Sequence, residues 1–187
     1  MISGNLVGLR ALERTDLPQL MEWRNKPEMR KYFRESSELN SSNQLKWYES
    51  VIDINSIHKM FAIIKLDTHE LMGACGLCYI DWVNRSADFS IYLGYQDLYI
   101  DDTYAIEAAN LMREYGFGIL NLHRLWAEIY SIDQQKKLFF NTLGFKQDGL
   151  HRETYWYDNK WHHSLFYSSL STDAKIPLHD SPRVVKK

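Results

Sequence analysis

The chain of 187 residues is poor in several features, and each scarcity narrows what it can be. It has no unbroken apolar run of about 18 residues, the length that a membrane-spanning helix needs. Its opening segment "MISGNLVGLR" is not typical of a signal peptide. Neither charge dominates, because 22 Lys and Arg stand against 24 Asp and Glu and leave a net charge of −2. We therefore expect no membrane and no nucleic acid as a partner.

Cysteine is equally scarce, with two residues in the motif "CGLC", Cys75 and Cys78. Such a pair can be redox-active or half of a zinc site. Here it lies in the apolar run "LMGACGLCYI", which indicates a strand. Residues three apart on a strand point to opposite faces, so we expect two ordinary buried thiols. The adjacent His162 and His163 also diverge on a strand, and no metal site is expected.

What the chain does contain is a globular composition, with 45% hydrophobic and 14% aromatic residues. No linker, repeat or low-complexity segment interrupts residues 5–170. We expect one domain over residues 1–170 and a mobile tail over 171–187, which holds two of the four prolines. A soluble cytoplasmic protein, monomeric or homodimeric, is the natural interpretation of these features.

Hydrophobic periodicity predicts a mixed order of elements. A strand is followed by three helices, then by three strands, a helix, a strand, a helix and two closing strands. Gly144 is well placed to end the last helix in a left-handed conformation. The expected strands are 5–12, 59–66, 70–80, 85–94, 123–132, 144–158 and 161–170, and the expected helices are 16–25, 27–33, 41–52 behind a serine cap, 101–118 and 133–143.

The stretch "LYIDDTYAIEAANLMREYGFGIL" (98–120) carries a strand through a loop into a helix that we expect to start near Asp101. Unpaired backbone N–H groups at such a helix start can bind phosphate. This loop has no glycine but has two carboxylates, Asp101 and Asp102. Two interpretations stay open: a phosphate-bearing cofactor binds there, or an aspartate caps the helix and occupies its donors.

Over residues 5–170 the sequence resembles the GNAT acetyltransferase superfamily. More narrowly, it resembles the branch with ribosomal-protein N-terminal acetyltransferases and nucleotide-amino-sugar acetyltransferases. The resemblance implies an α/β (α+β) fold, with a mixed, mostly antiparallel central sheet and helices on both faces. It is carried by the order and spacing of four segments: "LVGLRALERTDLPQLMEWRNKPEMR", "LMGACGLCYIDWVNRSADFSIYLG", "YAIEAANLMREYGFGILNLHRLWAEI" and "LFFNTLGFKQDGLHRETYWYDNKWHHSLFYSSL".

The resemblance implies an N-acetyltransferase in which an amine attacks the thioester of acetyl-CoA directly. The acceptor could be a protein N-terminus, an amino sugar or a small amine. Near-neutral charge argues mildly against a dedicated polyamine enzyme, which would profit from an acidic cleft. The alternative is a GNAT-fold binding or regulatory protein with a degenerate pyrophosphate loop. By the resemblance, the residues in contact with the acyl-CoA cofactor are Ile91, Tyr92, Leu93, Asp102, Thr103, Tyr104, Ala105, Asp133, Lys136 and Phe140.

The cofactor motifs of the family are altered in this chain. Where relatives carry a Gln/Arg-x-x-Gly-x-Gly/Ala loop, residues 100–105 read "IDDTYA", of which only Ala105 agrees. On the last helix, Asp133 and Lys136 stand where relatives often have Asn-x-x-Ser/Ala. Phe140 replaces a tyrosine that could donate a proton to the leaving thiolate. A thiol with a pKa near 8.5 leaves with modest help, so this last change matters less.

The resemblance also indicates catalytic and acceptor residues. Asp88 stands where relatives carry a glutamate and would be the general base; on its strand it shares a face with Ser90 and Tyr92. A strand with one wet face is the other interpretation of that polar row. For the acceptor we expect Trp23, Arg24 and Asn25, with Trp23 in the core as the alternative, and Tyr155 and Tyr157.

Overall fold

The computed structural model describes residues 1–53 and 55–173, and these build an eight-stranded sheet in the order β1-β2-β3-β4-β5-β6-β8-β7. Among the strands of this described part, only β5 and β6 run parallel, so the expected mixed and mostly antiparallel sheet is confirmed. The strands are β1 Ile2–Ser3, β2 Val7–Ala11, β3 Lys59–Lys65, β4 Leu71–Asp81, β5 Ser86–Leu93, β6 Arg124–Tyr130, β7 Lys146–Tyr157 and β8 Lys160–Leu170.

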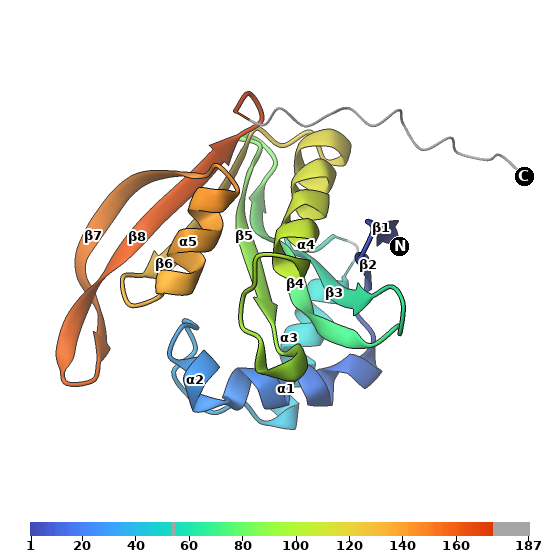
Figure 1. Cartoon of the computed structure of the whole chain (residues 1–187), viewed down its shortest axis with the longest axis horizontal. Coiled ribbons are helices and arrows are strands. Elements are labelled where there is room, and N and C mark those ends of the chain that lie inside the picture. Colours follow the sequence, from blue (N-terminus) through green and yellow to red (C-terminus); the bar gives the residue numbers. More distant parts are fainter. Residues whose placement is uncertain (54, 174–187) are drawn as a thin grey trace, which may run out of the picture.

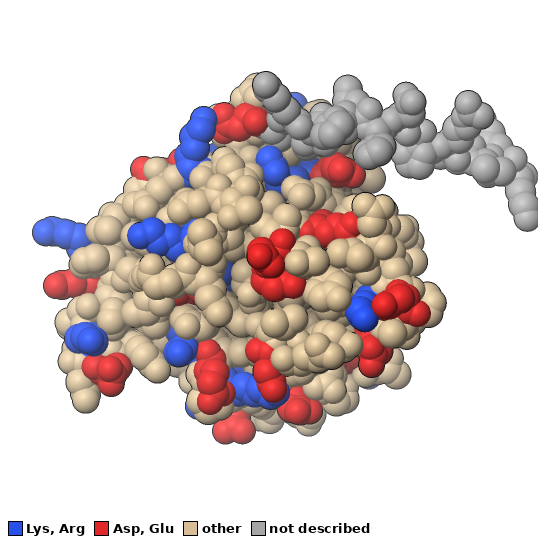
Figure 2. Space-filling model, viewed as in Figure 1, with Lys and Arg blue, Asp and Glu red and all other residues tan. Residues whose placement is uncertain are grey.

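The helices lie on both faces of this sheet, as expected (Figure 1). They are α1 Leu17–Asn25, α2 Pro27–Arg30, α3 Ser41–Ile52, α4 Tyr104–Arg113 and α5 Gln134–Thr142, with a π-helical turn over Glu114–Ile119. None of the described helices is long and apolar enough to cross a membrane. On the face seen in Figure 2, basic and acidic side chains are interspersed rather than gathered by sign.

Three details of the helix ends differ from or confirm the sequence-based expectation. The cap of α3 is Asn40, whose side chain accepts from the Asn43 amide, and not a serine. Helix α4 begins at Tyr104, three residues after the expected start. Gly144 does follow α5 at a φ of +76°. Of the expected tail, residues 174–187 lie outside the described part.

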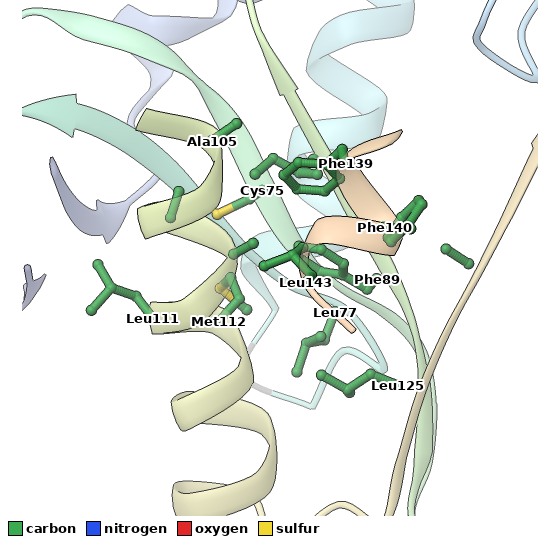
Figure 3. Close-up of a cluster of buried hydrophobic side chains, with 14 of the residues drawn as sticks. Cys75, Leu77, Phe89, Ala105, Leu111, Met112, Leu125, Phe139, Phe140 and Leu143 are labelled. Carbon is green, nitrogen blue, oxygen red and sulfur yellow. The ribbon is translucent and has the colours of Figure 1, made fainter. Parts of the chain in front are cut away.

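The core consists of two apolar clusters, one on each face of the sheet. One lies under α4 and α5 and is seen in Figure 3, where Met112 of α4 and Phe139 and Phe140 of α5 point toward side chains of β4, β5 and β6. The other lies under α1 and α3. The two cysteines separate as expected: Cys75 is buried in the first cluster, and the Cys78 thiol lies 3.6 Å from the Met60 sulfur.

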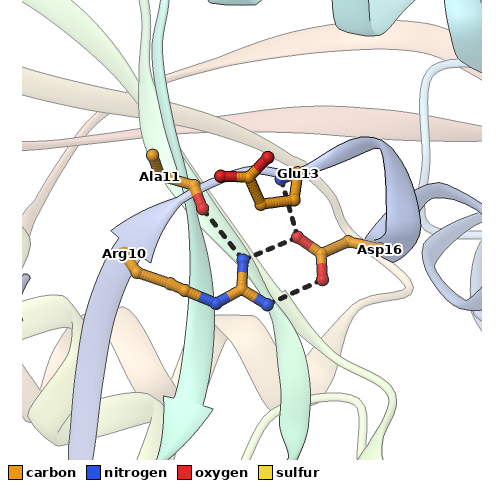
Figure 4. Close-up of polar contacts among 4 residues, drawn as sticks. All are labelled: Arg10, Ala11, Glu13 and Asp16. Carbon is orange, nitrogen blue, oxygen red and sulfur yellow. Dashed lines mark hydrogen bonds and ion pairs between the residues drawn. The ribbon is translucent and has the colours of Figure 1, made fainter.

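An ion pair fixes the start of α1 against the end of β2 (Figure 4). The Arg10 guanidinium donates to both carboxylate oxygens of Asp16 at 2.7 Å. Burial would raise the pKa of Asp16, but the bonds from Arg10 and the Glu13 amide outweigh it and hold that pKa below its usual value. This contact ties the residue before α1 to the end of β2.

The sheet is open in its middle, because the parallel strands β5 and β6 pair over only part of their length. Their pairing covers Ser86 to Asp88 on β5 and Arg124 to Trp126 on β6, although β5 continues to Leu93 and β6 to Tyr130. Beyond Asp88 the two strands separate, and α5 starts just after β6 (Figure 1). Beyond Asp88 the facing edges of β5 and β6 no longer pair with each other, and the site is built there.

Candidate active site

A cavity of about 580 Å³ lies where β5 and β6 separate. Its walls come from the end of α1, the loop over residues 31–40, α3, β4, β5, β6 and α5. Three carboxylates and three cations line it together with aromatic rings. They are Glu35, Asp88 and Glu128; Arg24, Arg34 and Lys136; and Tyr32, Phe33, Trp47, Tyr79, Phe89, Tyr92 and Phe140.

Two carboxylates of the cavity share one cation. Arg34 reaches in from the 31–40 loop, with its guanidinium 3.0 Å from the Asp88 carboxylate and 3.5 Å from that of Glu128. Asp88 is only 6% exposed. Burial raises the pKa of Asp88, and Arg34 opposes that rise only in part. A carboxylate in this setting binds a proton more readily than an exposed aspartate does.

The other two cations of the cavity have no carboxylate partner among the described residues. The Arg24 guanidinium lies 4.9 Å from the Phe33 ring centre, and the Lys136 ammonium lies 5.3 Å from that of Tyr99. Burial lowers the pKa of Lys136, and the neighbouring Asp133 and Asp88 only partly offset this effect. Both cations are therefore held by aromatic faces rather than by ion pairs.

Gln44 of α3 is the least satisfied polar side chain of the cavity wall. It is 2% exposed, and neither its amide nitrogen nor its amide oxygen finds a hydrogen-bond partner in the described part of the chain. The Nε of Arg24 is in the same situation. Buried polar groups without partners cost folding free energy. Their presence on one cavity wall is what a binding site for a polar molecule requires.

At the start of α4 the chain occupies its own donors. The two carboxylate oxygens of Asp101 accept from the backbone N–H groups of Tyr104 at 3.1 Å and Ala105 at 2.6 Å. This confirms the capping interpretation of the "IDDTYA" loop for Asp101. Asp102 is exposed and accepts from the Thr103 hydroxyl at 3.3 Å instead. The helix start is thus satisfied by an anion that belongs to the chain.

Tyr99, in the same loop, crosses from β5 to α5. Its backbone carbonyl accepts from the Leu93 N–H at 2.8 Å. Its hydroxyl donates to the Asp133 carboxylate at 2.8 Å, and the same carboxylate caps α5 by accepting from the Lys136 N–H. Burial, followed by the charge of Asp133, raises the pKa of Tyr99 well above its ordinary value, so the hydroxyl stays protonated and donates.

The cofactor residues expected on β5 and α5 separate into two groups. Tyr92, Lys136 and Phe140 line the cavity, whereas the side chains of Ile91 and Leu93 point into the core under α4. The alternation expected along β5 is confirmed, since Phe89 also joins that core. Phe140 is 1% exposed and packs on four other aromatic rings. The phenylalanine that replaces the family's tyrosine is therefore part of the apolar core.

Of the expected acceptor residues, only Arg24 lines the cavity. Trp23 is buried against Gly94, which leaves no room for a Cβ at that position. Asn25 exchanges hydrogen bonds of 2.8 Å with the backbone of Leu39 and so fixes the 31–40 loop. Tyr155 donates to the Lys31 carbonyl at 2.8 Å and stacks between Tyr130 and Tyr157.

Several residues of the site were not predicted from the sequence. Arg34 and Tyr99 lie in irregular loops without periodicity, and Gln44 looks like any polar residue of a helix. Glu128 carried a weak signal, because strand alternation in "RLWAEIY" places it on one face with Trp126 and Tyr130. Which face borders a cavity cannot be known until the sheet is assembled.

Comparisons with known proteins agree with this architecture. The model of the acetyltransferase (GNAT) domain matches residues 7–146. An uncharacterized N-acetyltransferase, p20, of Bacillus licheniformis is 29% identical over 147 residues, which are 78% of this chain and 82% of that protein. The spermidine N(1)-acetyltransferase of Escherichia coli K12 is 26% identical over 157 residues, with 80% of this chain and 77% of that protein covered.

A crystal structure of spermidine N-acetyltransferase from Vibrio cholerae, in complex with CoA and spermine, superposes with a TM-score of 0.80. The match covers 90% of this chain and 97% of that chain at 23% identity, which establishes the shared fold. None of these relatives is named as a ribosomal-protein or amino-sugar acetyltransferase. The narrower resemblance to that branch is therefore not supported.

Proposed function

Because the chain belongs to the GNAT acetyltransferase family, we propose that it acetylates a primary amine bound in the cavity, and that this amine is a polyamine. As a member of this family the protein is an enzyme, with acetyl-CoA as its co-substrate. Two relatives named above act on spermidine or bind spermine. The proposal for this chain depends on what its own cavity offers to an amine.

The observation that carries the proposal is the position of Arg34 between Asp88 and Glu128. The distances of 3.0 and 3.5 Å show that these two carboxylates together hold one cation. An alkylammonium group has the same charge and donates similar hydrogen bonds, so it can compete with Arg34 for the pair. The aromatic rings of the cavity, among them Tyr79 and Trp47, favour cations further.

Within this arrangement Asp88 has the role of general base. An ammonium must lose a proton before its nitrogen can attack, and the raised pKa of Asp88 suits it to accept that proton. The neutral nitrogen then forms a C–N bond with the acetyl carbon while the thioester C–S bond breaks, and coenzyme A leaves as a thiolate that takes up the second proton of the nitrogen. Glu128 holds the remaining positive groups of the acceptor.

Acetyl transfer to a panel of amines tests the proposal. Purified protein is incubated with acetyl-CoA and spermidine, spermine, an amino sugar or a peptide with a free N-terminus, and free thiol and acetylated product are measured. We expect product from the two polyamines at a far higher kcat/KM than from the other amines. Product from another amine alone would overturn the polyamine assignment, and product from none would overturn the transfer activity.

A variant of the second carboxylate sharpens this experiment. Glu128→Gln keeps the shape of the side chain and removes the charge that we assign to holding the acceptor. We expect the KM for spermidine to rise while kcat changes less, since the base Asp88 remains. A loss of kcat with an unchanged KM would contradict the role given to Glu128.

A further inference from the structure

One short segment of the chain makes hydrogen bonds at three places along the opening between β5 and β6. The positions are the start of α4, the free edge of β5 and the start of α5. Asp101 bonds the first, the Tyr99 carbonyl bonds the second and the Tyr99 hydroxyl bonds the third. A single segment therefore ties together the three elements that surround the opening.

The contact with β5 lies on the edge that faces the opening. The next residue, Gly94, donates its N–H to Met72 on β4, on the other side of the strand. Successive N–H groups along a strand point to opposite sides, so the Leu93 N–H points toward the separated β6. The Tyr99 carbonyl, at 2.8 Å, is thus bonded to the edge that an acyl-CoA arm would need.

Tyr99 is packed firmly in this position. It is 6% exposed, and its ring stacks on Tyr32 with centres 4.8 Å apart and meets Phe33 edge-on at 6.3 Å. The Lys136 ammonium lies over another part of the same ring. Both Tyr32 and Phe33 come from the loop that also carries Arg34, so the segment is locked by the wall of the acceptor cavity.

We propose that residues 98–103, here called the strap, close the acyl-CoA site from within, and that acetyl-CoA binds only when Tyr99 and Asp101 release their partners. The strap competes with the cofactor because the Asp101 carboxylate, the Tyr99 carbonyl and the Tyr99 hydroxyl are bonded to groups at the start of α4, on β5 and at the start of α5. The identity of the ligand rests on the function proposed above. The closed strap itself is a property of this chain.

Calorimetric titration with coenzyme A, without an acceptor, tests the strap. Asp101→Ala frees the Tyr104 and Ala105 amides, and Tyr99→Phe breaks the bond to Asp133 while it keeps the ring. We expect each variant to bind coenzyme A about tenfold more tightly than the original protein, the size expected for one charged hydrogen bond released. A closed state that dominates lowers apparent affinity by the open fraction, and the variants raise that fraction.

Asp102→Ala is the matched control, because it removes the same charge from the adjacent position but no bond to α4. Whatever gain in affinity it shows measures charge repulsion alone, and we expect Asp101→Ala to exceed that gain severalfold. Equal gains in the two alanine variants would overturn the strap. So would an unchanged affinity in Asp101→Ala and Tyr99→Phe.

Two further measurements distinguish an effect of the strap from a loss of folding and from a failure of the proposed function. A variant that merely unfolds cannot gain affinity, and circular dichroism of each variant verifies its structure. The amine panel is then repeated at saturating acetyl-CoA. Tighter coenzyme A binding without acetylation of any amine would overturn the proposed function and leave the strap in place, whereas amine acetylation with unchanged coenzyme A affinity would do the opposite.

Discussion

The two sides of β5 are built in opposite ways. On the side of α4, the first backbone N–H groups of the helix are paired within the chain, through the Asp101 carboxylate. On the side of α3, the Gln44 amide and the Arg24 Nε are buried without partners in the described structure. We call the side of α4, where the chain satisfies its own hydrogen-bond donors, the filled side. The side of α3, where buried polar atoms have no partner in the described structure, is the unsatisfied side.

This difference indicates how each side meets its ligand. A ligand on the unsatisfied side gains hydrogen bonds that the empty protein lacks, so binding there is favoured from the start. A ligand on the filled side must first replace bonds that already exist, so its affinity is reduced by the energy of opening. Changing one residue at a time on either side can break or sharpen this contrast.

The largest expected effect is at Asp88, which lines the acceptor cavity. Asp88→Asn keeps the size of the side chain and removes the base, and we expect kcat to fall by about 10²- to 10⁴-fold with polyamine as acceptor. Steady-state kinetics measure it. Asp81→Asn, at the exposed end of β4, is the control for a lost aspartate charge and is expected to stay near the original rate. Retention of full activity by Asp88→Asn would exclude it as the base.

The next effect concerns the pH dependence of the acceptor side. Burial raises the pKa of Asp88 and Arg34 lowers it in part, so Arg34→Gln should leave that pKa higher still. Asp88 must be ionised to accept a proton, and activity falls as the pH drops through its pKa. We therefore expect the acid limb of the kcat/KM profile to move to higher pH in Arg34→Gln. An acid limb that stays in place would show that another group controls it.

On the filled side, we expect one substitution to lower the stability of the protein and to raise its affinity for the cofactor. Asp101→Ala removes the cap of α4 and should lower the free energy of unfolding by about 1 kcal/mol. Denaturant titration measures this loss, and coenzyme A should restore more stability to the variant than to the original protein. A variant as stable as the original would mean that other groups satisfy the α4 amides.

The smallest effect should appear on the unsatisfied side, with the opposite sign. Gln44→Leu is close in volume and removes two unpaired buried atoms, so the empty protein should gain roughly 0.5–1 kcal/mol. Gln19→Leu, a partly exposed change on α1, is the control and should have little effect. The KM for the acceptor should rise in Gln44→Leu, and a destabilised Gln44→Leu would show that the Gln44 amide already has a partner such as water.

Much of the framework was predictable because it depends on local order. Strand alternation placed Cys75 and Cys78 on opposite faces and put Asp88 on one face with Ser90 and Tyr92. It did not show that the side chains of Ile91 and Leu93, expected to contact the cofactor, point into the core. Turn chemistry placed Gly144 after α5. The aspartates of the "IDDTYA" loop offered a cap for α4, and Asp101 supplies it. Each of these features is settled within a few residues of chain.

The acceptor side was predicted less well, since its contacts join distant segments. Arg34 meets carboxylates at positions 88 and 128, which no periodicity relates to it. Trp23, expected either as an acceptor contact or in the core, packs in the core against Gly94, so its alternative interpretation is confirmed. The near-neutral charge of the whole chain also said little about the cavity, because the local arrangement of charges decides what a cavity binds.

The sequence by itself determined the succession of strands and helices, the apolar faces and the absence of glycine from the loop before α4. Those depend on spacing and on the conformational freedom of single residues. Tertiary structure decided that Asp88 and Glu128 share one cation and that Tyr99 bridges β5 and α5. The physical reason is that hydrogen bonds and ion pairs act over about 3 Å, and only the assembled sheet brings these groups that close.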